Sequence, residues 1–414
     1  MDSLQNDANK HPNRSDSCLP FSPFFILFCK KLILLSKLLD FRLIGYRRFK
    51  VKIELAKSSE HLITLTNKRH YDIHMTFSTS SFLKWYIKNQ RILPWREDPT
   101  PYHVYLSEMM LQQTQVKKVL PYYIRFLEAY PSIDSLASAT LKEVNLLWQG
   151  LGYYSRAKNL LEGAKTIAKL HSFPHSKEDL LKISGIGEYT AKAICAIAFH
   201  QKEIAVDGNL IRVYSRFQED KEKNLSLLKR NAEAFFKKAL QKEDPSSFNQ
   251  ALMDLGEMVC LPNGMPLCAS CPLKEGCKAY KHSTQLLYPP KKEKKERKQV
   301  DMTVLLFRYQ DQIFIHKRED KGLLASLYEY PNVPKELEKS ELERNLKEQG
   351  ILFSKILSLR KEKHAFSHIL WKMTPYRIET EALDIPYPGE WIALKDLGTR
   401  YPMPSAFKKI KIEN

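Results

Sequence analysis

Four cysteines crowd into one short stretch of the chain, at Cys260, Cys268, Cys271 and Cys277. They lie within 18 residues and are separated by seven, two and five residues. A disulfide framework would spread paired cysteines through a short secreted chain, so this clustering indicates a metal or cluster site in a reducing compartment. Four thiolates this close together can surround a [4Fe–4S] cube. Zinc is the second interpretation, because its sites usually use two CxxC knuckles and this loop, residues 260–277, has one.

The chain of 414 residues is long enough for two or three apolar cores. From Ser78 to about Thr284, apolar residues recur at a spacing of three and four, which predicts helices. No alternating strand pattern occurs in this part. We therefore expect an all-α domain over residues 75–284.

A change of composition follows at residues 285–299, which include Pro289, Pro290 and the charge run KKEKKERK. This pattern is typical of a linker, either merely solvated or also in contact with phosphates. Beyond it, Val300–Phe307 and Gln312–His316 read as a β-hairpin, and Lys335–Gln349 as a helix. We expect an α+β domain over residues 300–414 and a multidomain protein overall.

Residues 1–74 do not match either domain. The apolar run Phe21–Leu39 is interrupted by three lysines, which makes it a poor membrane span, and no signal-peptide cleavage site follows it. We expect translation to begin at or near Met75; a basic, amphipathic membrane-surface anchor is the alternative. The net charge of +19 suits a polyanionic partner.

Two further motifs accompany the cysteines. Gly185-Ile186-Gly187 opens a helix between Leu-Lys-Ile and Tyr-Thr-Ala, and Val206-Asp207-Gly208-Asn209 follows twenty residues later. With the cysteine loop, they resemble the endonuclease III and MutY superfamily of DNA glycosylases. The resemblance implies a helix-hairpin-helix that grips the DNA backbone through Gly185 and Gly187, and a structural, DNA-sensing [4Fe–4S] cluster. The family has six residues in the first cysteine gap, so we expect the extra residue to bulge outward.

The resemblance extends to the chemistry of base removal. The string around Glu108 and the segment starting Leu93-Pro94-Trp95-Arg96 resemble the MutY branch. They imply that Glu108 protonates N7 of adenine and that Asp207 stabilises the sugar cation, while Tyr189 and Asn209 orient the two. Family members that cut the strand carry a lysine at position 189, so Tyr189 favours a monofunctional hydrolase.

Access to adenine requires its extrusion from the duplex. The resemblance implies that two groups of residues serve this extrusion. An adenine pocket is formed by Leu93, Trp95 and Arg96, and intercalating positions lie at Gln113, Thr114 and Tyr153. Taken by residue type alone, Trp95 and Tyr153 are equally typical of ordinary core aromatics.

The last domain resembles the Nudix-like C-terminal domain of the MutY branch, beginning with Gly322-Leu323-Leu324. The helix at 340–350 lacks the carboxylate pattern that holds Mg²⁺ in a Nudix hydrolase, so we expect no nucleotide hydrolysis. The loop containing Phe366, Ser367 and His368 matches the one that inspects 8-oxoguanine.

The implied function is base-excision repair of adenine paired with 8-oxoguanine or guanine in double-stranded DNA. We expect a monomer that needs no membrane and acts in a bacterial-type cytoplasm at the nucleoid. Two alternatives remain: a glycosylase/lyase of the endonuclease III kind, and an iron–sulfur electron carrier or non-catalytic DNA binder. The latter would leave the pair Glu108 and Asp207 unexplained.

Overall fold

A computed structural model of the chain describes residues 77–290 and 296–412. The expectations for residues 1–74, including the run Phe21–Leu39 and a start at Met75, fall outside these ranges. Within the described ranges, no helix combines the length and apolar character needed to cross a membrane.

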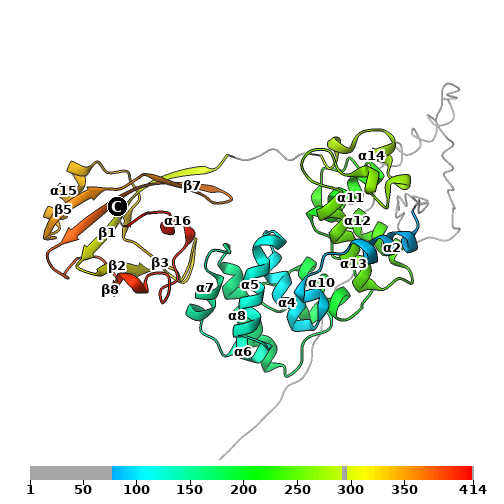
Figure 1. Ribbon diagram of the computed structural model, residues 1–414, viewed down its shortest axis with the longest axis horizontal. Helices are drawn as coiled ribbons and strands as arrows, with labels where there is room; N and C mark the ends of the chain where they lie inside the picture. Colours follow the sequence, from blue (N-terminus) through cyan, green and yellow to red (C-terminus); the bar gives the residue numbers. More distant parts are fainter. Residues whose placement is uncertain (1–76, 291–295, 413–414) are drawn as a thin grey trace, which may run out of the picture. The chain divides into compact units, whose positions relative to one another are not determined.

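Residues 77–290 are helical throughout, as the apolar spacing predicts (Figure 1). The α-helices are α2 (Thr79–Asn89), α3 (Pro94–Glu97), α4 (Pro101–Leu111), α5 (Val116–Ala129), α6 (Ile133–Ala137), α7 (Leu141–Trp148), α8 (Ser155–Lys169), α9 (Lys177–Leu180), α10 (Glu188–Ala198), α11 (Gly208–Gln218), α12 (Leu225–Leu240), α13 (Pro245–Asp254) and α14 (Lys278–Lys281). Short π and 3₁₀ turns are η1 (Leu255–Val259), η2 (Cys268–Ser270), η3 (Lys274–Gly276) and η4 (Gln285–Leu287).

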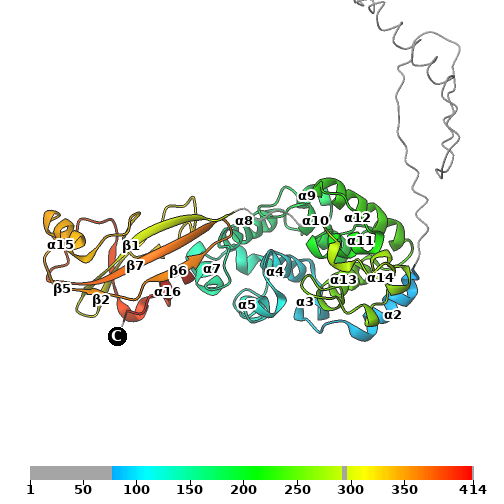
Figure 2. The same ribbon diagram turned by 90° about the horizontal axis from the view of Figure 1, so that it is seen from above.

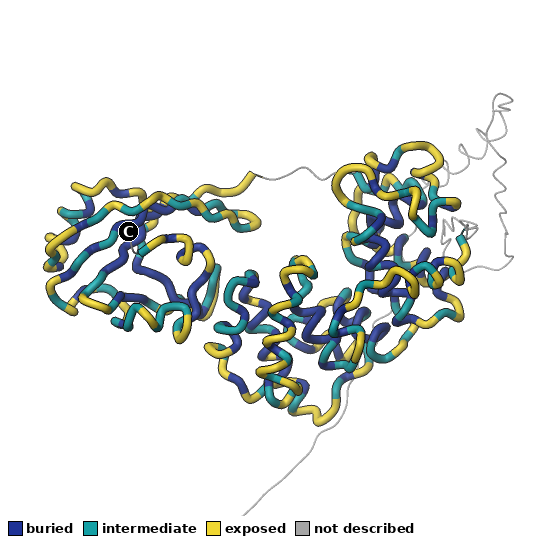
Figure 3. Tube along the Cα trace, in the orientation of Figure 1, coloured by how far each residue is buried: buried dark blue, intermediate teal, exposed yellow. Residues whose placement is uncertain are grey.

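Two apolar cores fill this helical part, visible as dark segments inside each helix group in Figure 3. One core is formed mainly by α4, α5, α7, α8 and α10, and the other by α2, α11, α12 and α13. Helix α10 packs against both α4 and α13. Side chains from the two cores therefore approach each other around α10.

Local sequence sets the bounds of the helices that matter most for the site. Thr100 accepts a hydrogen bond from the amide of His103, and Pro101 fits the first turn, so α4 begins there. It ends before Gln113, whose φ of 57° lies in the left-handed region. Asp207 caps α11 in the same way, by accepting from the amide of Leu210.

The C-terminal domain is one mixed sheet with short helices (Figure 2). Its elements are β1 (Lys298–Tyr309), β2 (Gln312–Lys317), β3 (Tyr328–Glu329), β4 (Asn332–Val333), α15 (Lys339–Glu348), β5 (Phe353–Ser358), β6 (Glu362–Ala365), β7 (Ile369–Thr380), β8 (Glu390–Ala393), η5 (Leu394–Asp396) and α16 (Ser405–Lys408). The strand order is β3-β2-β1-β7-β5, and β1 runs parallel to β7. β4 pairs with β1, β6 with β7, and β8 with β2.

Strand β1 is buried on both faces because each face meets a different core. Val304 and Leu306 point into one core with Phe407 of α16, whereas Leu305 and Phe307 point into the other, which includes α15. Successive side chains of a strand alternate between faces, so a continuous apolar run is what such a central strand requires. The expected fold class, a helical core followed by an α+β domain, is confirmed.

Individual boundaries differ from the expectations. The hairpin of β1 and β2 forms as predicted. The helix expected from Lys335 starts only at Lys339, because the amide of Leu337 donates to the Thr303 hydroxyl and ties the preceding residues to β1. At 285–299, Gln285–Leu287 form a 3₁₀ turn and β1 already begins at Lys298, so both ends of the expected linker belong to folded elements.

Candidate active site

A cavity beside α4 is lined by residues from five segments: the stretch before α4, and helices α4, α5, α10 and α13. Leu93, Trp95 and Arg96 line it together with Glu108 and, from α13, Gln250. The empty space between its side chains, open solvent included, is about 400 Å³, of which about 40 Å³ has room for the centre of a water molecule. The other lining residues are Arg91, Val104, Ser107, Leu111, Val116, Ile197 and Met253. The structure therefore brings together the residues expected to form a base pocket and the first expected catalytic carboxyl group.

Glu108 lies on α4 with 5% of its surface exposed. Burial raises its pKa to about 7, and the nearby charge of Asp207 adds to the rise. A hydrogen bond from Tyr189 and the charge of Arg96 act in the opposite direction. The protonated form of Glu108 is therefore available near neutral pH, as a proton donor requires.

Asp207 lies in a different environment, at the N-terminus of α11. Its Oδ1 accepts from the amide of Leu210 at 2.7 Å. Burial raises the pKa of Asp207 above its ordinary value, but this bond, the charge of Arg212 and hydrogen bonds from Asn209 oppose the rise. A helix N-terminus favours a negative charge, so the contacts favour ionisation of Asp207 before that of Glu108.

Tyr189 and Asn209 complete this group. Tyr189, on α10, hydrogen-bonds to Glu108, and burial raises its own pKa well above the ordinary value, so it stays a neutral donor. Asn209 is hydrogen-bonded to Asp207 and also accepts from Nη2 of Arg212 at 2.9 Å. All four expected catalytic residues therefore meet in one place.

Arg96 is committed to a buried ion cluster. Its two terminal nitrogens donate to Oδ2 and Oδ1 of Asp254 at 2.7 and 2.9 Å, and Nε of Arg91 donates to Oδ1 at 2.7 Å. Asp254 is fully buried. Its burial alone would raise the pKa, but the bond and charge of Arg96 hold it below the ordinary value. The cluster fastens the segment before α4 to α13.

Sequence reasoning missed Gln250 and Asp254. Both lie on α13 four residues apart, so they share one face of the helix. Polar side chains at that spacing in the string FNQALMD were the available signal. Gln250 is buried and its amide nitrogen donates to the Ser246 hydroxyl at 3.0 Å.

The two glycines of the expected hairpin have different roles in packing. Gly185 has φ +79°, and a Cβ there would lie 2.6 Å from Cε of Met109. Gly187 precedes α10, and a Cβ there would meet no atom within 4 Å. The first backbone amides of α10 therefore lie beside an open surface, where they can donate hydrogen bonds to a phosphate oxygen.

The remaining expected DNA contacts lie elsewhere. Tyr153, Phe366, Ser367 and His368 line a second cavity, of about 1530 Å³ with open solvent included. The hydroxyl groups of Tyr153 and Ser367 are 3.4 Å apart. Tyr153 is 46% exposed, so it is not a core aromatic, whereas Trp95 is only 6% exposed. Gln113 and Thr114 line neither cavity and follow the end of α4.

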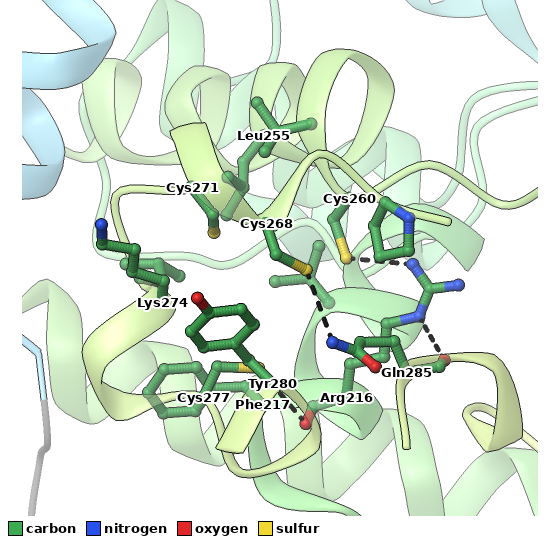
Figure 4. A pocket seen from close by; sticks show the side chains of 14 residues that line it. Arg216, Phe217, Leu255, Cys260, Cys268, Cys271, Lys274, Cys277, Tyr280 and Gln285 are labelled. Carbon is green, nitrogen blue, oxygen red and sulfur yellow. Dashed lines mark hydrogen bonds between the residues drawn. The ribbon is translucent and has the colours of Figure 1, made fainter. Parts of the chain in front are cut away.

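The four clustered cysteines line one cavity of about 430 Å³, partly open to solvent (Figure 4). Nη1 of Arg216 lies 3.3 Å from Sγ of Cys260, and Nε2 of Gln285 lies 3.8 Å from Sγ of Cys268. Donors directed at sulfur favour thiolates, so the residues fit a thiolate-ligated group. The loop residues 262–265 are exposed, and Gly264 has φ +69°. The middle of the long first gap therefore projects into solvent, whereas Pro266 is buried.

Comparisons with known proteins identify the families that this chain resembles. Residues 106–240 match the family described as "HhH-GPD superfamily base excision DNA repair protein", and residues 302–412 match the NUDIX domain. An adenine DNA glycosylase of Buchnera aphidicola is 33% identical over 313 residues, covering 74% of this chain and 87% of the relative. That of Homo sapiens is 30% identical, covering 86% of this chain and 78% of the relative.

Among solved structures, a non-covalent endonuclease III–DNA complex is 22% identical and covers 50% of this chain and 94% of that one, with a TM-score of 0.43. A thermostable thymine-DNA glycosylase is 26% identical with a TM-score of 0.44, covering 49% of this chain and 94% of that one. The expected helix-hairpin-helix core and Nudix-like domain are thus confirmed by the family matches. With identities of 33% and 30% over 87% and 78% of the length of these relatives, the chain belongs to the adenine DNA glycosylase family, whose members are base-excision DNA repair hydrolases.

Proposed function

We propose that this protein releases adenine paired with 8-oxoguanine or guanine in duplex DNA, with Glu108 and Asp207 as the catalytic pair. The observation that carries the proposal is a buried carboxyl group, with its pKa raised to about 7, beside a second carboxyl group that caps a helix. Adenine leaves its sugar poorly unless it is protonated, and its departure leaves positive charge on the sugar. One neutral and one ionised carboxyl group meet both needs.

In this mechanism Glu108 donates its proton to N7 of the extruded adenine. Asp207 stabilises the sugar cation or bonds to it transiently, and Glu108, now ionised, then activates the attacking water. Tyr189 holds Glu108 by its hydrogen bond, and Asn209 holds Asp207. Leu93 and Trp95 would bound the base, while Arg96 keeps that wall attached to α13 through Asp254.

Extrusion of the adenosine leaves a gap in the base stack. We assign Gln113, Thr114 and Tyr153 to filling it, since Gln113 and Tyr153 are exposed at turns. Gly185 and Gly187 would hold the phosphate backbone. Base removal without strand cleavage is supported by Tyr189, which cannot form an imine. Lys192 lies three residues after Tyr189 on α10. Its Nζ is 2.8 Å from Oε1 of Glu233, and this ion pair raises the pKa of Lys192, although burial alone would lower it.

We assign a [4Fe–4S] cluster to Cys260, Cys268, Cys271 and Cys277 in preference to zinc. The four thiols line one shared cavity, but among the described residues no three Cys, His, Asp or Glu side chains converge closely enough to hold a single metal ion. Such a cluster supplies structural rigidity and sensitivity to DNA rather than hydrolytic chemistry. Arg216 and Gln285 would donate to its ligand sulfurs.

In the C-terminal domain, Phe366, Ser367 and His368 are proposed to inspect the oxidised base. Phe366 packs against Trp371 with ring centroids 4.8 Å apart, which anchors the loop to the domain core. We propose no nucleotide hydrolysis, because the helix at 340–350 lacks the carboxylate pattern that holds Mg²⁺ in a Nudix hydrolase. Its carboxylates Glu341 and Glu343 pair with Lys335 and Lys347.

We propose a division into a helical domain of residues 75–284, a connecting segment of residues 285–299 and a C-terminal domain of residues 300–414. The 3₁₀ turn η4 and the start of β1 at Lys298 lie within the two ends of the connecting segment. It also includes a monomer that works on double-stranded DNA in a bacterial-type cytoplasm, at the nucleoid, without a membrane. The preceding residues 1–74 are not needed for the proposed chemistry.

Replacing Glu108 with Gln, or Asp207 with Asn, should nearly abolish adenine release, with a loss of roughly 10²–10⁴-fold for the proton donor. Single-turnover assays on a duplex carrying adenine opposite 8-oxoguanine measure this directly. Binding of the same duplex should persist and serves as the control for folding. Near-normal release by either variant would disprove the assignment, and strand breakage without alkali would favour a lyase.

The pH dependence of the single-turnover rate should be bell-shaped. Glu108 must be protonated, so the rate should decline as pH rises through about 7, the pKa to which burial raises this group. Asp207 must be ionised, and since its pKa is raised, the acid limb should lie above the ordinary value for aspartate. A flat profile across the neutral range would contradict a proton-donor role for Glu108.

Protein purified without oxygen should contain about four iron and four sulfide per chain. Removing Asn263, one of the exposed residues of the first gap, should leave that content unchanged because the loop projects outward. Stoichiometric zinc in place of iron would overturn the cluster assignment.

Combining Ser367→Ala with His368→Ala should weaken the preference for 8-oxoguanine over guanine opposite adenine by roughly five- to tenfold, the effect of about one lost hydrogen bond. The ratio of single-turnover rates on the two duplexes is the measurement. Ser354→Ala, at an exposed position of β5, is the matched control. An unchanged ratio in the double variant would exclude the loop from base inspection.

A further inference from the structure

Arg156, the second residue of α8, is a buried cation with 5% of its surface exposed. Within residues 77–290 and 296–412, no carboxylate forms a salt bridge with it. Its hydrogen bonds go to neutral oxygens instead. A buried charge is costly unless it is well bonded, so these acceptors decide what Arg156 does in the fold.

One terminal nitrogen of Arg156 closes the end of α4. Nη1 donates to the carbonyl oxygens of Met110 and Gln112 at 2.6 Å each, and of Met109 at 3.2 Å. The last carbonyls of a helix lack partners within the helix, and a cation there satisfies them and favours the helix dipole. Arg156 thus fixes the point at which the chain leaves α4.

The other terminal nitrogen reaches two separate turns. Nη2 donates to the Thr114 hydroxyl at 3.0 Å and to the Gly152 carbonyl at 3.1 Å. The guanidinium carbon also lies 5.3 Å from the ring centroid of Tyr153. One planar group therefore bonds the turn at 112–114 and the turn at 152–153 at the same time.

Both turns hold a residue in a backbone conformation that side chains disfavour. Gln113 has φ 57° and Tyr153 has φ 50°. Such conformations persist where surrounding contacts impose them, and they concentrate at functional sites. The bonds of Arg156 adjoin both residues: they go to Gln112 and Thr114 on either side of Gln113, and to Gly152 just before Tyr153.

We propose that Arg156 is a positioning residue that sets Gln113 and Tyr153 at a fixed distance from each other, so that both enter the duplex together as adenosine is extruded. This inference rests on the intercalating role proposed above for these two residues. Lysine cannot replace Arg156, because a single ammonium lacks the two-sided fork that spans both turns. The effect should fall on extrusion and not on the chemistry of the freed base.

The test compares two duplexes that both carry adenine opposite 8-oxoguanine. One is fully paired around the lesion, and in the other mismatched neighbours already unstack the adenine. Arg156→Lys should slow single-turnover release on the paired duplex by about ten- to a hundredfold, the scale of a misplaced contact group. On the unstacked duplex the loss should be several times smaller. Titration of active sites corrects both rates for any misfolded fraction.

Thr114→Val keeps Arg156 and removes one acceptor of Nη2. Because Thr114 is itself assigned to the gap in the base stack, this variant tests the turn at 112–114 as a whole and not Arg156 alone. Its single-turnover rate should also fall more on the paired duplex than on the unstacked duplex, by a smaller factor than that of Arg156→Lys. Arg125→Lys, an exposed arginine on α5 that lies over Tyr122, is the matched control and should act like the wild type on both duplexes. The loss of rate in the double variant Tyr153→Ala with Arg156→Lys should be less than the combined losses of the two single variants, because both changes affect the same pair of intercalating residues.

Equal losses on the two duplexes, after correction for active sites, would overturn the positioning role and leave Arg156 as a purely structural residue. The same holds if Thr114→Val slows both duplexes equally or neither. Failure of the wild type to release adenine from either duplex would instead refute the proposed function. The two failures are therefore separable.

Discussion

Helix α11 joins the candidate catalytic loop to the cysteine loop, and both depend on the arginines that this helix carries. Arg212 donates to the Asn209 side chain, to the Gly256 carbonyl and to the Cys260 carbonyl. One turn later Arg216 donates to Cys260 Sγ and to the Leu261 carbonyl. Because residues four apart share one helix face, both side chains point toward the cysteine loop. A shift of that loop would therefore disturb the backbone that presents Asp207.

The difference between the two carboxyl groups follows from where the chain places each one. Glu108 lies in the last turn of α4, where the backbone amides are already bonded within the helix and the neighbours are mostly apolar. Asp207 lies at a helix start, where free amides and Arg212 stabilise a negative charge. Both are removed from water, so both pKa values rise. The surroundings alone then decide which group keeps its proton.

The sequence was sufficient for features that repeat a local pattern. The helical spacing of residues 78–284 and the hairpin at residues 309–312 both follow from short strings. It was insufficient where distant segments meet. The start of α15 depends on a bond from Leu337 to Thr303, and the anchoring of Arg96 depends on Asp254, 158 residues away. The residue spacing around Leu337 or Arg96 does not indicate which distant residue each one contacts.

Helix α4 links two steps that the proposed reaction must coordinate. Glu108 lies within the last turn of this helix, and Gln113 follows the helix directly, so along the axis the proton donor and the intercalating turn are only about 8 Å apart. A helix of this kind moves as a rigid piece. Bonds that fix its end, such as those of Arg156 to Met110 and Gln112, therefore also fix the position of Glu108 relative to the base stack. Extrusion and protonation of adenine therefore both depend on α4. A displacement of the intercalating turn would also displace Glu108.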